Sequence, residues 1–160
     1  MPAPYFFFRP VLATDRSWAA IDWQPASILT TGSEDFVRCF SESDAAPLAN
    51  LLPMIAPARP AWFEDSAFVD AFDPSQIVFM LQASSLDSAE AMGRCKELRT
   101  LGYRIGLHVD SASLVQRAPL SAFNYVRFEA AYARQDFPVA DLSYARDAGL
   151  HKIAAGVGTL

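Results

Sequence analysis

The chain has 160 residues, of which 52% are hydrophobic and 19% are charged. This length is typical of one domain, and we predict a single domain over residues 1–160 that buries its core without disulfides or metals. The composition excludes a disordered chain. The longest aliphatic-aromatic run, at residues 77–81, is far shorter than the about 20 residues that a membrane span needs, so we expect no membrane insertion.

The charge balance and the cysteines bear on partners and compartment. Eighteen acidic residues against thirteen basic ones give a formal net charge of −5, so we expect no general binding to nucleic acid. The two cysteines, Cys39 and Cys95, are far apart and have no metal-ligand spacing; two thiols in a domain that can bury its own core indicate a reducing compartment. No basic segment precedes the N-terminal aromatic run, which argues against a signal peptide and predicts a cytoplasmic protein.

The first predicted element is an aromatic hairpin. Residues 5–12 and 18–23 are aromatic and β-branched enough for two strands, and the turn residues between them join the strands. Because side chains alternate along a strand, only one set of these aromatic residues can fill the core. The other set predicts a surface for self-association or for a protein partner. This predicted partner surface comprises Tyr5, Phe6, Phe7, Phe8, Trp18 and Trp23.

The middle of the sequence has weaker patterns. Residues 36–40 fit a short strand or a helical turn. Apolar residues recur at helical spacing over residues 45–56 and predict a helix, which Pro53 should end or kink. Residues 63–72 predict a short amphipathic helix that stops at the following Asp-Pro pair. The apolar positions of the first of these helices are Leu48, Leu51, Leu52 and Ile55.

The second half alternates strands with connections. Residues 77–81 form a continuous apolar run, which is typical of a strand buried on both faces. Asp87 and Glu90 resemble a capping box for a helix that ends at Gly102. A second helix is predicted from about residue 138 to residue 148. Three more strands are predicted over residues 103–109, 123–129 and 151–157.

Alternating strands and helices with buried strands predict an α/β protein with a parallel sheet. The spacing is that of a (β/α) barrel, which ordinarily needs about 250 residues. We therefore expect a TIM-like barrel of about six strands, incomplete at its C-terminal end.

Five segments carry a resemblance to one family. The segment LRTLGYRIGLHVD at residues 98–110 resembles the LKxxGYRIALDDFG segment of EAL domains. In the same order, residues 125–129 stand where the family has xIKID, residues 153–159 where it has IAEGVET, and residues 77–82 where it has LVLEITE. The hairpin resembles RQPI…YELLFR, a short form found in the EAL-plus-HDOD subfamily. The resemblance implies an EAL-type (β/α) barrel whose first strand is antiparallel.

The resemblance also implies a chemistry. Active EAL domains hydrolyse cyclic di-GMP with Mg²⁺ or Mn²⁺, which carboxylates hold at the strand ends because hard cations prefer oxygen ligands. Here those positions differ, and Arg127 replaces the family lysine that positions water; its guanidinium stays protonated and is a poor base. Asp110 lies one place beyond the family's aspartate pair. The family's acids correspond to Asp22, Met80, His108, Val109, Glu129, Ala155 and Gly158.

From these departures we predict a non-catalytic EAL-like signalling or regulatory domain that acts through protein–protein interaction, with no metal and no cofactor. The remaining polar residues predict a vestigial site at the barrel mouth, in which Arg127 pairs with Glu129 or Asp22 and fills the former metal space. One alternative is a sensor that binds cyclic di-GMP or another nucleotide without turnover; the family's phosphate-gripping arginine falls at Ala26, which argues against it. The vestigial site comprises Asp22, His108, Asp110, Arg127 and Glu129.

A second alternative is a divergent phosphodiesterase, or an enzyme with rebuilt chemistry around His108 and Asp110. The lost acids argue against both forms of this alternative. A further interpretation makes His108, Asp110, Arg127 and Glu129 a new metal or ligand pocket.

Overall fold

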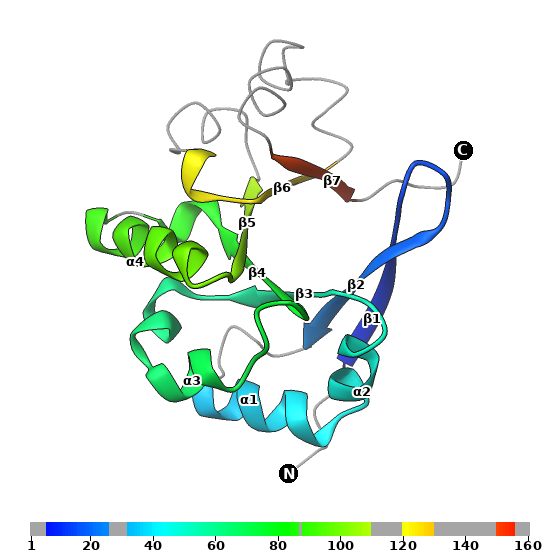
Figure 1. The fold of residues 1–160 in the computed structure, drawn as a ribbon, viewed down its shortest axis with the longest axis horizontal. Coiled ribbons are helices and arrows are strands. Elements are labelled where there is room, and N and C mark those ends of the chain that lie inside the picture. Colours follow the sequence, from blue (N-terminus) through cyan, green and yellow to red (C-terminus); the bar gives the residue numbers. More distant parts are fainter. Residues whose placement is uncertain (1–5, 26–31, 87, 110–119, 130–149, 156–160) are drawn as a thin grey trace. The chain divides into compact units, whose positions relative to one another are not determined.

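The computed structural model describes residues 6–25, 32–86, 88–109, 120–129 and 150–155. The chain forms two units, Met1–Phe79 and Met80–Leu160, whose elements are labelled in Figure 1. In the first unit the strands neighbour one another in the order β1–β2–β3–β4, and in the second in the order β4–β5–β6–β7. Strand β4 (Ile77–Gln82) carries the chain from one unit into the other.

The first unit begins with the predicted hairpin. Strands β1 (Phe6–Leu12) and β2 (Trp18–Pro25) pair antiparallel, with an irregularity between Val11 and Leu12. In the turn between them, the carboxylate of Asp15 accepts hydrogen bonds from the backbone N–H and the hydroxyl of Ser17, at 2.9 and 2.6 Å. The predicted hairpin is therefore confirmed. Aromatic residues favour the two strands, and the Asx turn at Asp15 joins them tightly.

The predicted helix over residues 45–56 is wrong. Only a short helix, α2 (Ala45–Ala49), forms, and residues Met54–Ala58 are strand β3, which pairs parallel with β2 at Ile21↔Met54 and Asp22↔Ile55. Met54, Ile55 and Ala56 are buried in succession, as in a strand covered on both faces. This strand brings the described residues to seven strands rather than about six.

The other helices of the first unit also depart from the sequence predictions in part. Residues 36–40 lie within a helix, α1 (Ser33–Glu42). The predicted helix over residues 63–72 is instead a 3₁₀ turn, η2 (Pro60–Glu64), followed by α3 (Ser66–Asp70). The break falls at Asp65, whose carboxylate accepts a 3.0 Å hydrogen bond from the N–H of Ala67 and begins α3 there.

An aromatic core holds the first unit together. Trp23 of β2 contacts Phe36 and Phe40 of α1 edge-on, with ring centroids 4.8 and 5.6 Å apart. Phe36 also contacts the rings of Trp62 in η2 and Phe68 in α3, and Phe68 in turn contacts Phe79 of β4. Edge-to-face and tilted pairs of this kind add to the free energy gained by burial. The further members of this core are Trp62, Phe63, Phe68, Phe72 and Phe79.

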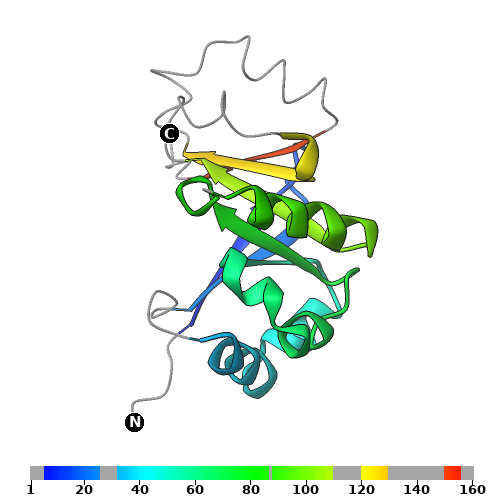
Figure 2. The same cartoon turned by 90° about the vertical axis from the view of Figure 1, so that its left-hand side faces the viewer.

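The second unit contains a parallel sheet. Strands β5 (Arg104–Val109), β6 (Tyr125–Glu129) and β7 (His151–Ala155) pair parallel, as predicted. Helix α4 (Ala89–Thr100) lies along β5 in Figure 2. Short 3₁₀ turns, η3 (Ala83–Ser85) and η4 (Leu120–Ala122), precede α4 and β6.

The ends of α4 confirm one sequence prediction and correct another. Ser88, and not Asp87, is the N-cap, because its hydroxyl accepts a 3.1 Å hydrogen bond from the N–H of Ala91. Gly102 ends the helix with a φ of 97°, a conformation that favours glycine. The predicted helix near residues 138–148 lies outside the described residues. No helix in the described part of the chain is long and apolar enough to cross a membrane.

The two cysteines should differ in reactivity. Burial raises the pKa of both thiols, that of Cys95 to about 11, but Cys39 is only partly buried whereas Cys95 is buried. Since the thiolate is the nucleophile, Cys95 should stay protonated and unreactive at pH 8. We expect iodoacetamide to alkylate Cys39 in the native protein and Cys95 only after denaturation, as read by peptide mass spectrometry. A Cys39→Ser variant that is alkylated at the wild-type rate without denaturant would contradict this expectation.

Candidate functional site

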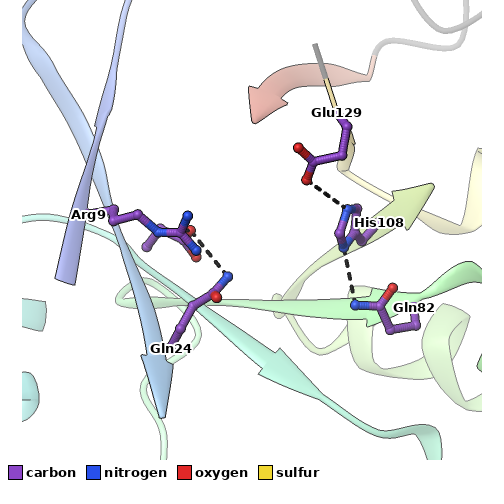
Figure 3. Close-up of polar contacts among 6 residues, drawn as sticks. Arg9, Gln24, Gln82, His108 and Glu129 are labelled. Carbon is purple, nitrogen blue, oxygen red and sulfur yellow. Dashed lines mark hydrogen bonds and ion pairs between the residues drawn. The ribbon is translucent and has the colours of Figure 1, made fainter. Parts of the chain in front are cut away.

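Asp22 is the centre of a polar cluster in the first unit. Its side chain is buried within the hairpin, where it accepts a hydrogen bond of 3.4 Å from Gln24 Nε2. The exposed guanidinium of Arg9 lies opposite it on β1 and reaches it at 3.7 Å (Figure 3). Both contacts converge on Oδ2 of Asp22. The carboxylate is therefore engaged by a cation and an amide of its own hairpin.

A second polar cluster lies in the second unit, where strands β4, β5 and β6 end. His108 is its centre: Nδ1 lies 3.1 Å from Nε2 of Gln82, and Nε2 lies 3.6 Å from Oε1 of Glu129 (Figure 3). If the imidazole is neutral, the amide of Gln82 donates to Nδ1 and the Nε2–H points toward the carboxylate. Protonation of His108 would turn the second contact into an ion pair.

The structure brings together three of the five residues of the predicted vestigial site. His108 stands directly across from Arg127 in the register of β5 and β6, and Glu129 lies two residues further along β6. Arg127 is buried, at 7% exposure. Asp22 belongs to the first unit, and Asp110 lies outside the described residues. Oε1 of Glu129 lies 3.6 Å from Nε2 of His108.

Met80 occupies the position that the resemblance assigns to a metal-binding glutamate. It is 5% exposed, and its thioether packs over the bare backbone of Gly106. A Cβ built at position 106 would lie 2.6 Å from Cε and 2.9 Å from Sδ of Met80. The Met80 side chain therefore occupies the space above Gly106, where it makes apolar contacts.

These side chains do not fit a hard divalent cation. Mg²⁺ and Mn²⁺ prefer carboxylate, carbonyl and water oxygens, whereas Met80 offers a thioether and the buried Val109 offers only methyl groups. His108 is held by Gln82 and Glu129. Among the residues that the structure describes, no group of three His, Cys, Asp or Glu side chains could hold a metal ion.

The predicted partner surface is divided between surface and core. Phe7, Phe8 and Trp18 are exposed by 60%, 41% and 59%. Trp23 is fully buried, so its assignment to a partner surface is wrong: the ring packs against α1 and belongs to the core. Tyr5 and the side chain of Phe6 lie outside what the structure describes.

Sequence reasoning missed several residues of these surfaces and clusters. Leu12 is exposed by 53% beside Trp18, its neighbour across the hairpin, although only aromatic residues had been assigned to the patch. Arg9 and Gln82 contact the predicted site residues Asp22 and His108. A polar residue that ends an apolar parallel strand, such as Gln82, is a signal that could have been used, because strand ends of this kind meet at one edge of the sheet.

Comparisons with known proteins give no match by sequence and clear matches by structure. Neither a scan against protein-family models nor a search of the curated proteins finds a match. The structure is similar to the EAL domain of DcpA from Mycobacterium smegmatis, with a TM-score of 0.70 and 14% identity over 98% of this chain and 83% of that one.

Two longer proteins are also similar. BlrP1 from Klebsiella pneumoniae, in a complex with calcium and cyclic di-GMP, matches with a TM-score of 0.66 and 14% identity over 98% of this chain. The EAL enzyme Bd1971, in a form that contains cAMP and cyclic di-GMP, matches with a TM-score of 0.63 and 12% identity over 99% of this chain. The chain spans about half the length of these two proteins, 50% and 56%. Identities this low show the fold alone: the chain has the α/β, TIM-barrel-like fold of EAL domains.

Proposed function

We propose that the chain is an EAL-like domain that has lost the hydrolysis of cyclic di-GMP and serves in the cytoplasm as a regulatory module that contacts other protein chains. In this proposal it is a diverged relative of the EAL-plus-HDOD type. Its fold supports a place in cyclic di-GMP signalling, because several structures with this fold contain that nucleotide.

One observation carries the proposed loss of hydrolysis. Met80 is buried and packed on Gly106 at the position where the resemblance places a metal-binding glutamate. A thioether cannot replace a carboxylate as a ligand for Mg²⁺ or Mn²⁺. Without these metals the attacking water is not activated and the phosphate charge is not neutralised.

Isothermal titration with cyclic di-GMP, with and without Mn²⁺, tests this part of the proposal. We expect no heat of micromolar binding under either condition. BlrP1, whose structure contains cyclic di-GMP, is titrated in the same buffer and controls for the quality of the nucleotide. Micromolar binding that requires Mn²⁺ would contradict the loss of the metal site.

The hairpin supports the proposed protein contact. Phe8, Leu12 and Trp18 are exposed, and the register places Leu12 opposite Trp18. Among the described strands, β1 ends the strand order and has β2 as its neighbour there. Exposed edge strands with large apolar side chains pair readily with another chain. The partner that we propose is a second copy of this chain, which would bring the same patch and the same edge.

Glutamate substitutions in the hairpin test this contact. Leu12→Glu and Trp18→Glu place a charge at exposed positions of this patch, so they should preserve the fold while weakening self-association by about tenfold or more. Analytical ultracentrifugation over a concentration series measures the effect. Leu51→Glu is the matched control, because Leu51 is 76% exposed outside the hairpin and its substitution should leave association unchanged. A wild-type protein that stays monomeric at millimolar concentration would overturn the proposed self-association.

A further inference from the structure

A hollow in the second unit lies apart from the residues of both polar clusters. It has a volume of about 290 Å³ and is formed where α4 ends, where β5 begins and where the chain enters β6. This volume is near the lower end of the roughly 300–1,000 Å³ typical of small-molecule sites. Its lining residues are Lys96, Arg99, Thr100, Gly102, Tyr103, Arg104 and Asn124.

The lining is strongly cationic. It contains one lysine and two arginines and no acidic residue, in a chain whose formal net charge is −5. Glu97, the acid of the same helical turn, is outside the lining and forms an ion pair of 2.6 Å with Arg94. Three cationic residues around one hollow attract anions to it.

Stabilisation of the helix end accounts for these charges only in part, since Arg99 is the basic residue of the last turn. Basic side chains often lie in the last turn of a helix because they interact with its orphan carbonyls. Here the backbone N–H groups of Leu101, Gly102 and Tyr103 already donate to the carbonyls of Glu97, Arg99 and Leu98, at 3.0 Å each. The third cation, Arg104, is on β5 and not on the helix.

Hydrogen bonds within the unit position some of the donors. One arm of the Arg99 guanidinium, Nη1, donates to the backbone carbonyl of Ser121 and fixes the side chain against η4. Oδ1 of Asn124 accepts a 3.0 Å hydrogen bond from the N–H of Ile105, so its Nδ2 is the part of the amide that can donate to a ligand. Guanidinium, ammonium and amide donors around one hollow are suited to a phosphate group.

We propose that this hollow binds a small phosphate-bearing anion, either free phosphate or a phosphorylated metabolite. Lys96, Arg99 and Arg104 supply the charge, and Asn124 supplies a neutral donor. The site is independent of the proposed loss of hydrolysis, because none of its residues belongs to the clusters around Asp22 and His108.

Amide chemical-shift titration of the ¹⁵N-labelled protein at low salt tests the proposal. The probes are inorganic phosphate and glucose 6-phosphate, which distinguish the two sources, and succinate, a dianion at pH 7 that carries comparable charge without phosphate. We expect saturable shifts at Gly102 and Asn124 with at least one phosphate probe. Lys96→Gln and Arg104→Gln should each raise the dissociation constant about tenfold, a typical effect of losing one charge-assisted contact.

Arg38→Gln is the control for the change in net charge, because Arg38 is an exposed residue of α1 that pairs with Asp35 and does not line the hollow. It should bind the probe as the wild type does. The amide spectrum of each variant reports at the same time whether the protein is folded. The proposal is overturned if neither phosphate probe saturates, if succinate binds more tightly than both, or if Lys96→Gln and Arg104→Gln bind as tightly as the wild type.

Discussion

Trp23→Ala is expected to lower the free energy of unfolding of the first unit by about 3–5 kcal/mol, the usual cost of truncating a buried tryptophan. The indole is fully buried and contacts Phe36 and Phe40, which connect β2 to α1. Truncation removes these contacts and leaves a cavity that the helix can close only in part. Urea denaturation followed by far-ultraviolet circular dichroism measures the loss.

Trp18→Ala is the matched control, since it makes the same chemical change in the same strand. Trp18 is 59% exposed, so its truncation should cost less than about 1 kcal/mol. If both variants lose the same free energy of unfolding, the burial of Trp23 is not the reason why this residue stabilises the first unit.

Met80→Glu, which restores the acid that the family has at this position, is expected to destabilise the second unit by about 3–5 kcal/mol rather than to restore activity. The side chain would place a carboxylate against the backbone of Gly106 in a position that is 5% exposed. An uncompensated charge in such a place is strongly unfavourable. Burial would also raise the pKa of the new carboxyl, so the deficit should shrink as the pH falls toward 4.

Met80→Leu provides the comparison for this prediction. It keeps the volume and the apolar character, so it should cost less than about 1.5 kcal/mol. Urea titrations at pH 7 and at pH 4.5 separate the two substitutions. A Met80→Glu protein as stable as the wild type at pH 7, with Mn²⁺ bound, would show that the metal site persists in a latent form.

The opening hairpin and the parallel strands of the second unit could be predicted because local signals agree with the fold there. Aromatic runs flank a short turn before Trp18, and Gly102 stands where α4 must end. The strand at residues 77–81 is a continuous apolar run bounded by polar residues. Such a run is typical of a strand in a sheet that is covered on both faces.

Strand β3 could not be predicted in the same way. Leu48, Leu51, Leu52 and Ile55 satisfy a helical period, although the first three precede the strand and only Ile55 lies in it. A buried parallel strand has no alternation of its own, so periodicity cannot separate it from a helix. Pro53, which was expected to end or kink a helix, instead precedes the strand; its carbonyl accepts a 2.9 Å hydrogen bond from the N–H of Ile21.

Some residues of the candidate site could be predicted from the sequence, but the contacts between their side chains could not. His108 and Glu129 follow from the family register, but their 3.6 Å contact depends on the pairing of β5 with β6. The partners Arg9 and Gln82 come from other strands. The place of Gln82 at a strand end can be read from the sequence, but its contact with His108 depends on the pairing between strands.

Turnover of cyclic di-GMP is the measurement that tests the proposed loss of hydrolysis most directly. The purified chain would be incubated with the nucleotide and either Mg²⁺ or Mn²⁺, with the EAL enzyme Bd1971 assayed in parallel, and the linear dinucleotide product would be separated by chromatography. Because Met80 and Val109 supply no hard ligand, the account predicts no product above that of a sample without protein. Metal-dependent product that accumulates over many turnovers, and that disappears in a Glu129→Gln variant, would contradict it.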